Sequence, residues 1–193
     1  MATIRLKLTI YDGEPKLPQA RNGEDLLAVQ LWGGGVTDRK TRTMATDPRR
    51  WLLLVEARGA ISIMTDQRTQ LFAWDLEQIY PGGQQSPENA GGVIISAMNI
   101  DPCAEEEFND WYNTEHMPVL SKLPGMLTAR RFKALEGKPD YIALYHVSDL
   151  SIYAKPSWTA VNETAWTKRM RRYQHNRTYF MFNRTMDATE GAR

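Results

Sequence analysis

Apolar and polar residues alternate strictly at the start of the chain and again near its middle. Ile4, Leu6, Leu8 and Ile10 are interleaved with Thr3, Arg5, Lys7 and Thr9. A period of two places the apolar side chains on one face of a strand. The segment GVIISAMNI, which ends at Ile100, has the same character. We therefore expect strands over residues 3–10 and 93–100.

Similar segments recur at an interval of 90 residues. The interval relates Ile4 to Ile94, Gly35 to Gly125, and residues 51–55 (WLLLV) to residues 141–145 (YIALY). A period of this length is typical of a duplicated small domain. Because few residues are identical, chance is the alternative reading of the pattern.

The second repeat predicts a complete set of elements. Asp101 can cap a helix whose first position is Pro102, and we expect this helix to end near Glu115, before Pro118. Strands follow over 127–134 and 141–147, a longer helix over 158–173, and a closing strand over 178–182. The order β-α-β-β-α-β is that of a ferredoxin-like unit.

The first repeat predicts the same strands, including an alternating run of Phe72, Trp74 and Leu76. Only a short segment separates its third and fourth strands, so its second helix must be short or missing. We therefore predict an α+β fold in which two ferredoxin-like units in tandem pack sheet to sheet as an α/β barrel. The expected boundaries are a degenerate unit at 1–80, a linker at 81–92, a second unit at 93–186 and a flexible tail at 187–193.

Composition excludes several classes of protein. The 193 residues are 42% hydrophobic and 24% charged, and 24 Lys and Arg oppose 23 Asp and Glu. A net charge of +1 gives no reason to expect a nucleic-acid partner. The lone Cys103 cannot form an internal disulfide, and the first residues lack an apolar signal core. We expect a cytoplasmic protein without a membrane partner.

The densest group of functional residue types is FNDWYNTEHMPVL, at 108–120. Phe108, Tyr112 and His116 follow each other at intervals of four, which places them on one line of a helix. Trp111 and Glu115 lie on the adjoining line. A histidine at a helix C-terminus is favoured as a cation by the helix dipole, and Glu115 would raise its proton affinity further. The alternative is that the aromatic residues form the core face of the helix.

This segment resembles a known family. An aromatic helix that closes with His116, Pro118, Val119 and Leu120, followed by LSKLPGMLTARRF, resembles the EthD-like branch of the dimeric α/β-barrel superfamily. The resemblance covers about residues 93–182. It implies two ferredoxin-like sheets packed into a barrel, and His116 as the polar group that faces the cleft between helix and sheet. It does not select a reaction, because relatives include isomerases, decarboxylases, cyclases, cofactor-free monooxygenases, haem enzymes and members without known activity.

The first repeat departs from this pattern, because Leu26 and Ala28 stand at the positions that the interval relates to His116 and Pro118. We therefore expect one site per chain, in the second half. There, Arg130 and Arg131 lie on opposite faces of a strand, so only one of them can point into a cleft. His146 could face His116 across that cleft, or could be an ordinary core or surface residue.

Other chemistries find less support. The basic run KRMRRYQHNR at 168–177 reads best as a solvated helix face, because the strand at 140–147 lacks the aromatic spacing of an RNA-recognition motif. No Gly-x-Ser-x-Gly element is present. The three histidines lack a metal-binding spacing. We expect neither a metal nor an organic cofactor.

The prediction is a small-molecule enzyme that performs cofactor-independent acid/base chemistry, of isomerase, lyase or decarboxylase type, on a cyclic or aromatic carbonyl compound. His116 would transfer the proton, and Tyr112 or Arg130 would polarise an oxygen. Phe108, Trp111 and His146 would bind the substrate. The alternatives are a non-catalytic ligand-binding accessory protein and a haem-binding barrel protein. Either is compatible with a homodimer.

Overall fold

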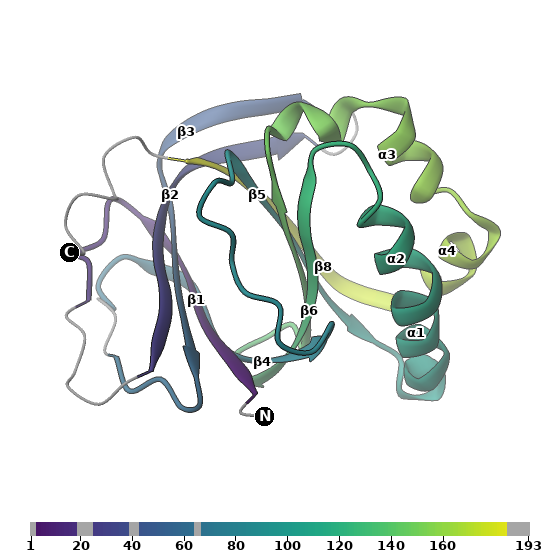
Figure 1. The fold of residues 1–193 in the computed structure, drawn as a ribbon, viewed down its shortest axis with the longest axis horizontal. Helices are drawn as coiled ribbons and strands as arrows, with labels where there is room; N and C mark the ends of the chain where they lie inside the picture. The colour runs from purple at the N-terminus through teal and green to yellow at the C-terminus, as the bar shows by residue number, and fades with distance from the viewer. Residues whose placement is uncertain (1–2, 19–24, 39–42, 64–66, 185–193) are drawn as a thin grey trace.

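A computed structural model describes residues 3–18, 25–38, 43–63 and 67–184, with only the backbone described at 35–38 and 43–46. The described chain forms a closed eight-stranded barrel with helices on one side (Figure 1). The strands are β1 (Ile4–Asp12), β2 (Leu26–Asp38), β3 (Thr43–Arg58), β4 (Gln70–Tyr80), β5 (Gly92–Ile100), β6 (Met126–Glu136), β7 (Tyr141–Val147) and β8 (Gln174–Arg184).

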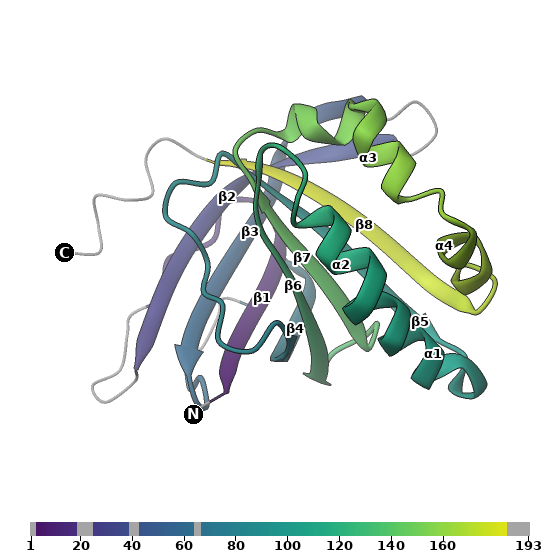
Figure 2. The same ribbon diagram turned by 45° about the vertical axis from the view of Figure 1, so that its right-hand side comes forward.

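The helices all follow β5 in the chain. Between β5 and β6 lie the 3-10 helix η1 (Pro102–Ala104), α1 (Glu105–Trp111), the π-helix η2 (Tyr112–His116) and α2 (Met117–Leu120). Between β7 and β8 lie η3 (Leu150–Ala154), α3 (Pro156–Val161) and α4 (Ala165–Met170). Figure 2 shows that this layer covers the outer face of the second half of the barrel.

Both halves of the barrel have the same strand order. The first half reads β4-β1-β3-β2 and the second reads β8-β5-β7-β6, and every pairing is antiparallel. The pairs β2–β8 and β4–β6 join the halves and close the barrel within one chain. The order fourth-first-third-second is that of the β-α-β-β-α-β unit, so the predicted fold class is confirmed.

Two apolar cores lie on the two faces of the second half's sheet. One fills the barrel, where Leu8, Leu54, Ile95 and Leu144 meet from both halves. The other lies between the sheet and the helices and includes Ile94, Phe108, Trp111, Tyr145 and Trp158. Because side chains alternate along a strand, the strands of the second half contribute to both cores.

The expected interval of 90 residues holds for only one pair of strands. Leu54 and Leu144, 90 residues apart, pair with Leu8 and Ile95 respectively, which are 87 residues apart. Because side chains alternate between the two faces of a strand, replacing the true interval of 87 by 90 pairs residues of β1 and β5 that lie on opposite faces. Ile10 points into the barrel, whereas Ile100 packs under the helices. The segments between strands differ in length in the two halves, so each pair of strands has its own interval.

The equivalents expected for His116 and Pro118 in the first half are wrong for the same reason. Leu26 is the first residue of β2, and Ala28 lies two residues further along that strand. Between β1 and β2 the structure describes residues 13–18 and 25, and these form no helix. The expected tail at 187–193 lies outside the described residues.

The helices of the second half differ from expectation at two points. The first helical stretch continues past Pro118 to Leu120. Pro118 has no N–H to donate, but the π-turn at 112–116 already interrupts the regular hydrogen-bond ladder at this point, so the helix tolerates the proline. The long helix expected over 158–173 divides into α3 and α4. Thr164 separates them, because its hydroxyl caps α4 by accepting a hydrogen bond from the N–H of Thr167.

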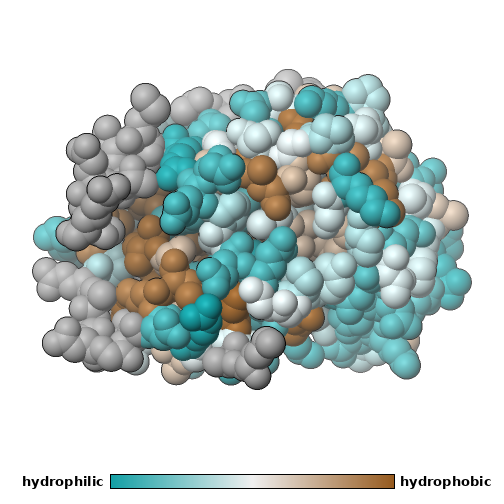
Figure 3. Space-filling model, in the orientation of Figure 1, coloured by the Kyte–Doolittle hydropathy of each residue, from teal (hydrophilic) through white to brown (hydrophobic). Residues whose placement is uncertain are grey.

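The outer surface is polar over the helices. In Figure 3 apolar residues gather over the first half, beside the residues drawn in grey, and the helical side is mainly hydrophilic. Within the described residues, none of the helices has the length and apolar character needed to cross a bilayer.

Candidate functional site

The candidate site is a cavity of about 310 Å³ between the helical layer and the sheet. Its base is formed by β5, β7 and β8, and its walls by the end of α1, by η2, η3, α3 and α4, and by the segment between α3 and α4. The lining residues are Ser96, Met98, Trp111, Tyr112, His116, Tyr145, Tyr153, Trp158, Asn162, Glu163, Thr167, Arg171, Gln174, Arg177 and Tyr179. Aromatic rings form a large part of this lining and most of the other residues are polar, which suits a small organic ligand that carries oxygen or charged groups.

A π-helical turn positions the histidine of this cavity. Across Tyr112–His116 the helix follows the wider π pitch, with the N–H of Met117 bonded to the carbonyl of Tyr112, five residues back. The rings of Trp111 and His116 are also five residues apart, and their centroids lie 4.5 Å from each other. The Tyr112 ring meets the imidazole edge-on at 5.1 Å. Single π-turns occur frequently at functional sites.

His116 is a neutral imidazole. Burial, together with the smaller effect of the positive charges of Arg131 and Arg171, lowers its pKa to about 3. The expected stabilisation of the cation by Glu115 is wrong, because the Glu115 carboxylate accepts a hydrogen bond from Thr164 at 2.7 Å instead. The dipole of one short helix does not offset the desolvation of a histidine that is 5% exposed.

Two polar atoms on the cavity wall are buried without a hydrogen-bond partner among the described residues. They are Nδ1 of His116 and Nε1 of Trp111. Because leaving a buried polar group unpaired costs about 1–3 kcal/mol, such groups require an explanation. Both residues line the cavity, so a molecule bound there can supply the missing partner.

Tyr112 carries its hydroxyl into the same region, 3.7 Å from the sulfur of Met98. Burial raises the pKa of Tyr112, and the nearby positive charge of Arg131 opposes that rise. The pKa of Tyr145 is raised well above its usual value, again chiefly by burial. Both phenols are therefore protonated at neutral pH and can donate hydrogen bonds.

Part of the basic run at 168–177 lies at this cavity and not on a solvated face. Arg171 and Arg177 line it together with Gln174. One guanidinium nitrogen of Arg171 lies 3.0 Å from a Glu163 carboxylate oxygen, and another donates to the carbonyl of Asn162. The remaining contacts of this run include an ion pair between Arg169 and Glu107 at 2.9 Å.

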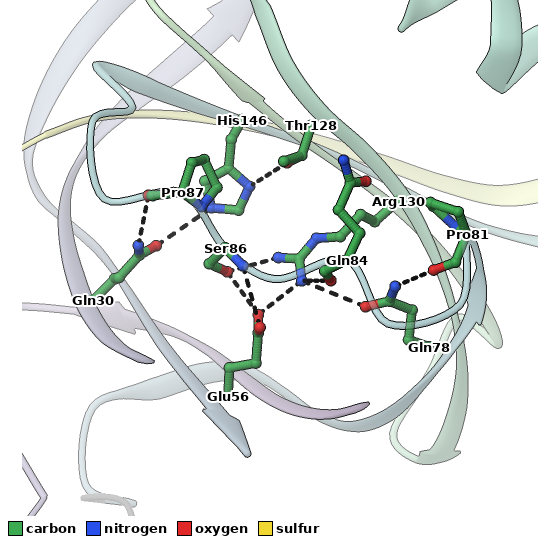
Figure 4. A network of polar contacts seen from close by, with 10 residues as sticks. All are labelled: Gln30, Glu56, Gln78, Pro81, Gln84, Ser86, Pro87, Thr128, Arg130 and His146. Atoms are coloured by element: carbon green, nitrogen blue, oxygen red, sulfur yellow. Dashed lines mark hydrogen bonds and ion pairs between the residues drawn. The ribbon is translucent and has the colours of Figure 1, made fainter. Parts of the chain in front are cut away.

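Arg130, expected to polarise the substrate, lies on the opposite face of the sheet. It points into the barrel, is fully buried, and forms a 2.7 Å ion pair with Glu56 (Figure 4). It also donates to the hydroxyl of Ser86 at 2.6 Å and to the carbonyl of Gln84 at 3.0 Å. With its terminal nitrogens engaged in this network, Arg130 cannot reach the cavity beside His116.

His146 also lies inside the barrel and does not face His116. Its two ring nitrogens are 3.2 Å from the Thr128 hydroxyl and 3.3 Å from the Gln30 amide oxygen (Figure 4). Burial and the charge of Arg130 lower its pKa well below the usual value, so it is neutral. The alternation of side chains correctly predicts that His146 and Tyr145 lie on opposite faces of their strand. Only the closed barrel shows which of these faces is the interior.

The remaining expected residues divide between core and cavity. Trp111 and Tyr112 line the cavity, whereas Phe108 is fully buried beneath Tyr112 at a ring distance of 4.9 Å. Trp158 also lines the cavity, and its ring packs on Tyr145. Tyr145, Tyr153 and Tyr179 were missed, because a tyrosine on a strand or short helix carries no local signal of a site.

The described part of the chain contains no group of three or more His, Cys, Asp or Glu side chains arranged to hold a metal ion. Cys103 is exposed on η1. Of the histidines, only His116 presents a ring nitrogen that is buried, unpartnered and on a cavity wall. The chemistry of the cavity therefore rests on one imidazole, several phenols, two guanidinium groups and the carboxylate of Glu163, which is paired with Arg171.

Comparisons with known proteins give the fold. No family profile and no curated protein matches the chain. Among solved structures, an uncharacterized ferredoxin-fold protein from Listeria monocytogenes related to antibiotic-biosynthesis monooxygenases has a TM-score of 0.57 at 10% identity, covering 96% of each chain. A protein from Fusobacterium nucleatum assigned as a monooxygenase has a TM-score of 0.54 at 7% identity, covering 95% of this chain and 93% of its own.

A third neighbour, an anthrone oxidase-like protein, has a TM-score of 0.53 at 10% identity and covers 96% of this chain and 92% of its own. At such low identity the likeness establishes the fold alone. The chain therefore has the ferredoxin-like barrel fold, over nearly its whole length.

Proposed function

We propose that the protein is a small-molecule enzyme that moves a proton on a cyclic or aromatic carbonyl compound bound in the cavity between helices and sheet. The observation that carries the proposal is the buried, unpartnered Nδ1 of His116 on the wall of a cavity of about 310 Å³. A neutral imidazole can accept a proton from a carbon or hydroxyl group, which an imidazolium cannot.

The charges around the cavity favour the product of that step. When His116 takes a proton from the carbon next to a carbonyl, the electron pair moves to the carbonyl oxygen and forms an enolate. Arg171 lies on the cavity wall, where the N–H groups that it does not use in its bonds to Glu163 and Asn162 can donate to that oxyanion. The positive charges of Arg131 and Arg171 also lower the pKa of the His116 imidazole. A bound anion reverses this effect, because it favours the imidazolium that forms beside it.

Tyr112 and Tyr145 supply donors for the same oxygen, because their phenols are protonated at neutral pH. Trp111 and Trp158 supply flat apolar walls. The fold neighbours that are named as monooxygenases or as anthrone oxidase-like support a ring-shaped, oxygen-bearing substrate. Returning the proton to a different atom gives an isomerase, and losing a leaving group gives a lyase. The EthD-like assignment and a cytoplasmic location belong to the same proposal.

Deuterium exchange into anthrone tests the proton transfer directly. Anthrone is a flat tricyclic ketone, and its methylene carbon exchanges through the enolate. We expect the protein in D₂O to accelerate this exchange, and His116→Ala to lower the acceleration by about 10²–10⁴-fold. His175→Ala is the matched control, because His175 is half-exposed on β8 and lies outside the cavity lining.

The outcomes separate the proposal from its alternatives. If the His116→Ala protein accelerates deuterium exchange into anthrone as much as the native protein does, the imidazole does not transfer the proton. Binding of anthrone, seen as quenching of tryptophan fluorescence, without any exchange would identify a non-catalytic ligand-binding protein. A Soret band in the purified protein would identify a haem protein.

A further inference from the structure

Arg131 lies directly behind the cavity wall and is 2% exposed. It comes from β6, on the face opposite to Arg130, and its guanidinium carbon is 4.3 Å from the centre of the Tyr112 ring. The rings of Phe108 and Tyr141 lie on its other sides at 5.2 and 5.7 Å. Of these three aromatic side chains, Tyr112 is the one that also lines the cavity.

The hydrogen-bond partners of Arg131 are neutral. Its two terminal nitrogens donate to the amide oxygens of Asn113 at 2.7 Å and Asn109 at 2.8 Å. The ion pairs found among the described residues do not include Arg131, whereas Arg130 next to it is paired with Glu56. The titratable groups that interact with Arg131 are the phenols of Tyr112, Tyr141 and Tyr145 and the imidazole of His116, and none of these is a carboxylate.

Arg131 is charged despite its burial. Desolvation lowers its pKa to about 10, which is still far above neutral pH. Burying a charge without a counter-charge is costly, and proteins usually pair such groups. Asparagine at 109 and 113 satisfies the hydrogen bonds of the guanidinium but does not neutralise it. The positive field therefore extends through Tyr112 towards His116 and the cavity.

We propose that Arg131 is a positioning residue for this site, and that its uncompensated charge makes the cavity prefer ligands in an anionic form, such as a phenolate or enolate. This deepens the proposed function and rests on it, because it names the charge state of the molecule that binds. Arg131 also fixes the wall itself, since its bonds to Asn109 and Asn113 tie α1 and η2 to β6.

The test uses 4-nitrophenol, a planar phenol that ionises near neutral pH and whose phenolate is coloured. Titration of the bound probe by absorbance gives its pKa in the cavity. We expect the native protein to bind the phenolate about tenfold more tightly than the phenol, which a single charge behind one aromatic ring can supply at the effective dielectric of a protein. Arg131→Gln should abolish the preference, and Arg131→Lys should retain most of it.

Asn113→Asp keeps the guanidinium in place and is the sharpest variant. It replaces one amide acceptor by a carboxylate of almost the same shape, so that Arg131 gains a counter-charge 2.7 Å away without losing its hydrogen bond. The phenolate preference should then fall as it does in Arg131→Gln. Lys133→Gln is the matched control, because Lys133 lies on the same face of β6 but is already paired with Glu105 at 3.0 Å.

A second readout needs no ligand. The ring protons of His116, followed by NMR, should titrate at a higher pH in Arg131→Gln and in Asn113→Asp than in the native protein, because a positive charge has been removed or neutralised. A purely structural role for Arg131 would leave the Asn113→Asp protein unchanged in both measurements.

Each outcome is decisive. Binding of 4-nitrophenol with equal affinity for phenol and phenolate overturns the role of Arg131 and leaves the proposed function standing. Absence of probe binding, in a protein that still catalyses anthrone exchange, does the same. Absence of both binding and exchange overturns the inference and the proposed function together.

Discussion

Arg130 and Glu56 are 74 residues apart in the chain and form a 2.7 Å ion pair at the boundary between the two halves of the barrel, with both side chains fully buried (Figure 4). Its counterpart is the contact between His146 and Gln30. Glu56 and His146 are on the third strand of their units, and Arg130 and Gln30 are on the second. Each contact therefore joins the second strand of one half to the third strand of the other.

We predict that breaking this pair from one side is far more harmful than removing it. Arg130→Met leaves the Glu56 carboxylate buried without its cation, which should lower the free energy of unfolding by about 3–5 kcal/mol. The double variant Arg130→Met with Glu56→Leu should lose clearly less than the two single variants added together. Urea unfolding measures all three.

The matched control for that series is an ion pair on the outer face. Arg5 and Glu77 are 2.8 Å apart, and about a third of each side chain is exposed. Arg5→Met should change the free energy of unfolding by less than about 1 kcal/mol. A cost at Arg130 no larger than this would contradict the structural importance of the buried pair.

Ser86 holds the connector between β4 and β5 to this pair. Its hydroxyl donates to Glu56 at 2.7 Å and accepts from Arg130 at 2.6 Å, and its N–H donates to Glu56 at 3.1 Å. Ser86→Ala should cost about 1.5–3 kcal/mol, the usual contribution of hydrogen bonds to charged groups. Limited proteolysis should then cut within residues 81–85 sooner than in the native protein. Unchanged cleavage would show that other contacts hold the connector.

Two glycines of the same connector should differ in their tolerance of alanine. A Cβ at Gly91 would lie 2.2 Å from the carbonyl oxygen of Ser148, whereas a Cβ at Gly82 meets nothing within 4 Å. Gly91→Ala should therefore lower the free energy of unfolding by about 1–3 kcal/mol, because the backbone of Ser148 must move. Gly82→Ala should leave thermal unfolding nearly unchanged. Equal melting temperatures for the two variants would refute the close approach at Gly91.

His116 should make the fold less stable in acid. Its pKa is about 3 in the folded protein, against an ordinary value of 6.5, so the unfolded chain binds a proton first as the pH falls below 6.5. The stability due to this group is complete above pH 6.5 and is lost progressively towards pH 3. Between pH 7 and pH 5 the loss is about 2 kcal/mol.

The measurement compares urea unfolding of the native protein with that of His116→Leu at several pH values. The stability difference between them should shift by about 2 kcal/mol in favour of the variant between pH 7 and pH 5. Parallel curves for the native protein and His116→Leu would mean that the imidazole is not held neutral.

Much of the fold can be predicted from the local sequence pattern, because the alternation of apolar and polar residues identifies the strands. The period of two at Ile4, Leu6 and Leu8 predicts β1, and residues 141–147 predict β7 with its observed bounds. The clustering at 108–120 also identified His116, Tyr112 and Trp111, all of which line the cavity. These signals survive without tertiary context because neighbouring residues on one element share a face by geometry alone.

The partners of those residues depend on packing between distant segments and leave no local trace. Adjacent residues Arg130 and Arg131 point to opposite faces of β6, but only closure of the barrel assigns Arg130 to Glu56 and Arg131 to the helical side. The neutral state of His116 results from its burial and from the charges of Arg131 and Arg171, and its neighbour Glu115 does not determine it. The alternation of a strand specifies two faces, whereas the choice between barrel interior and helix-covered cavity is made by what each face packs against.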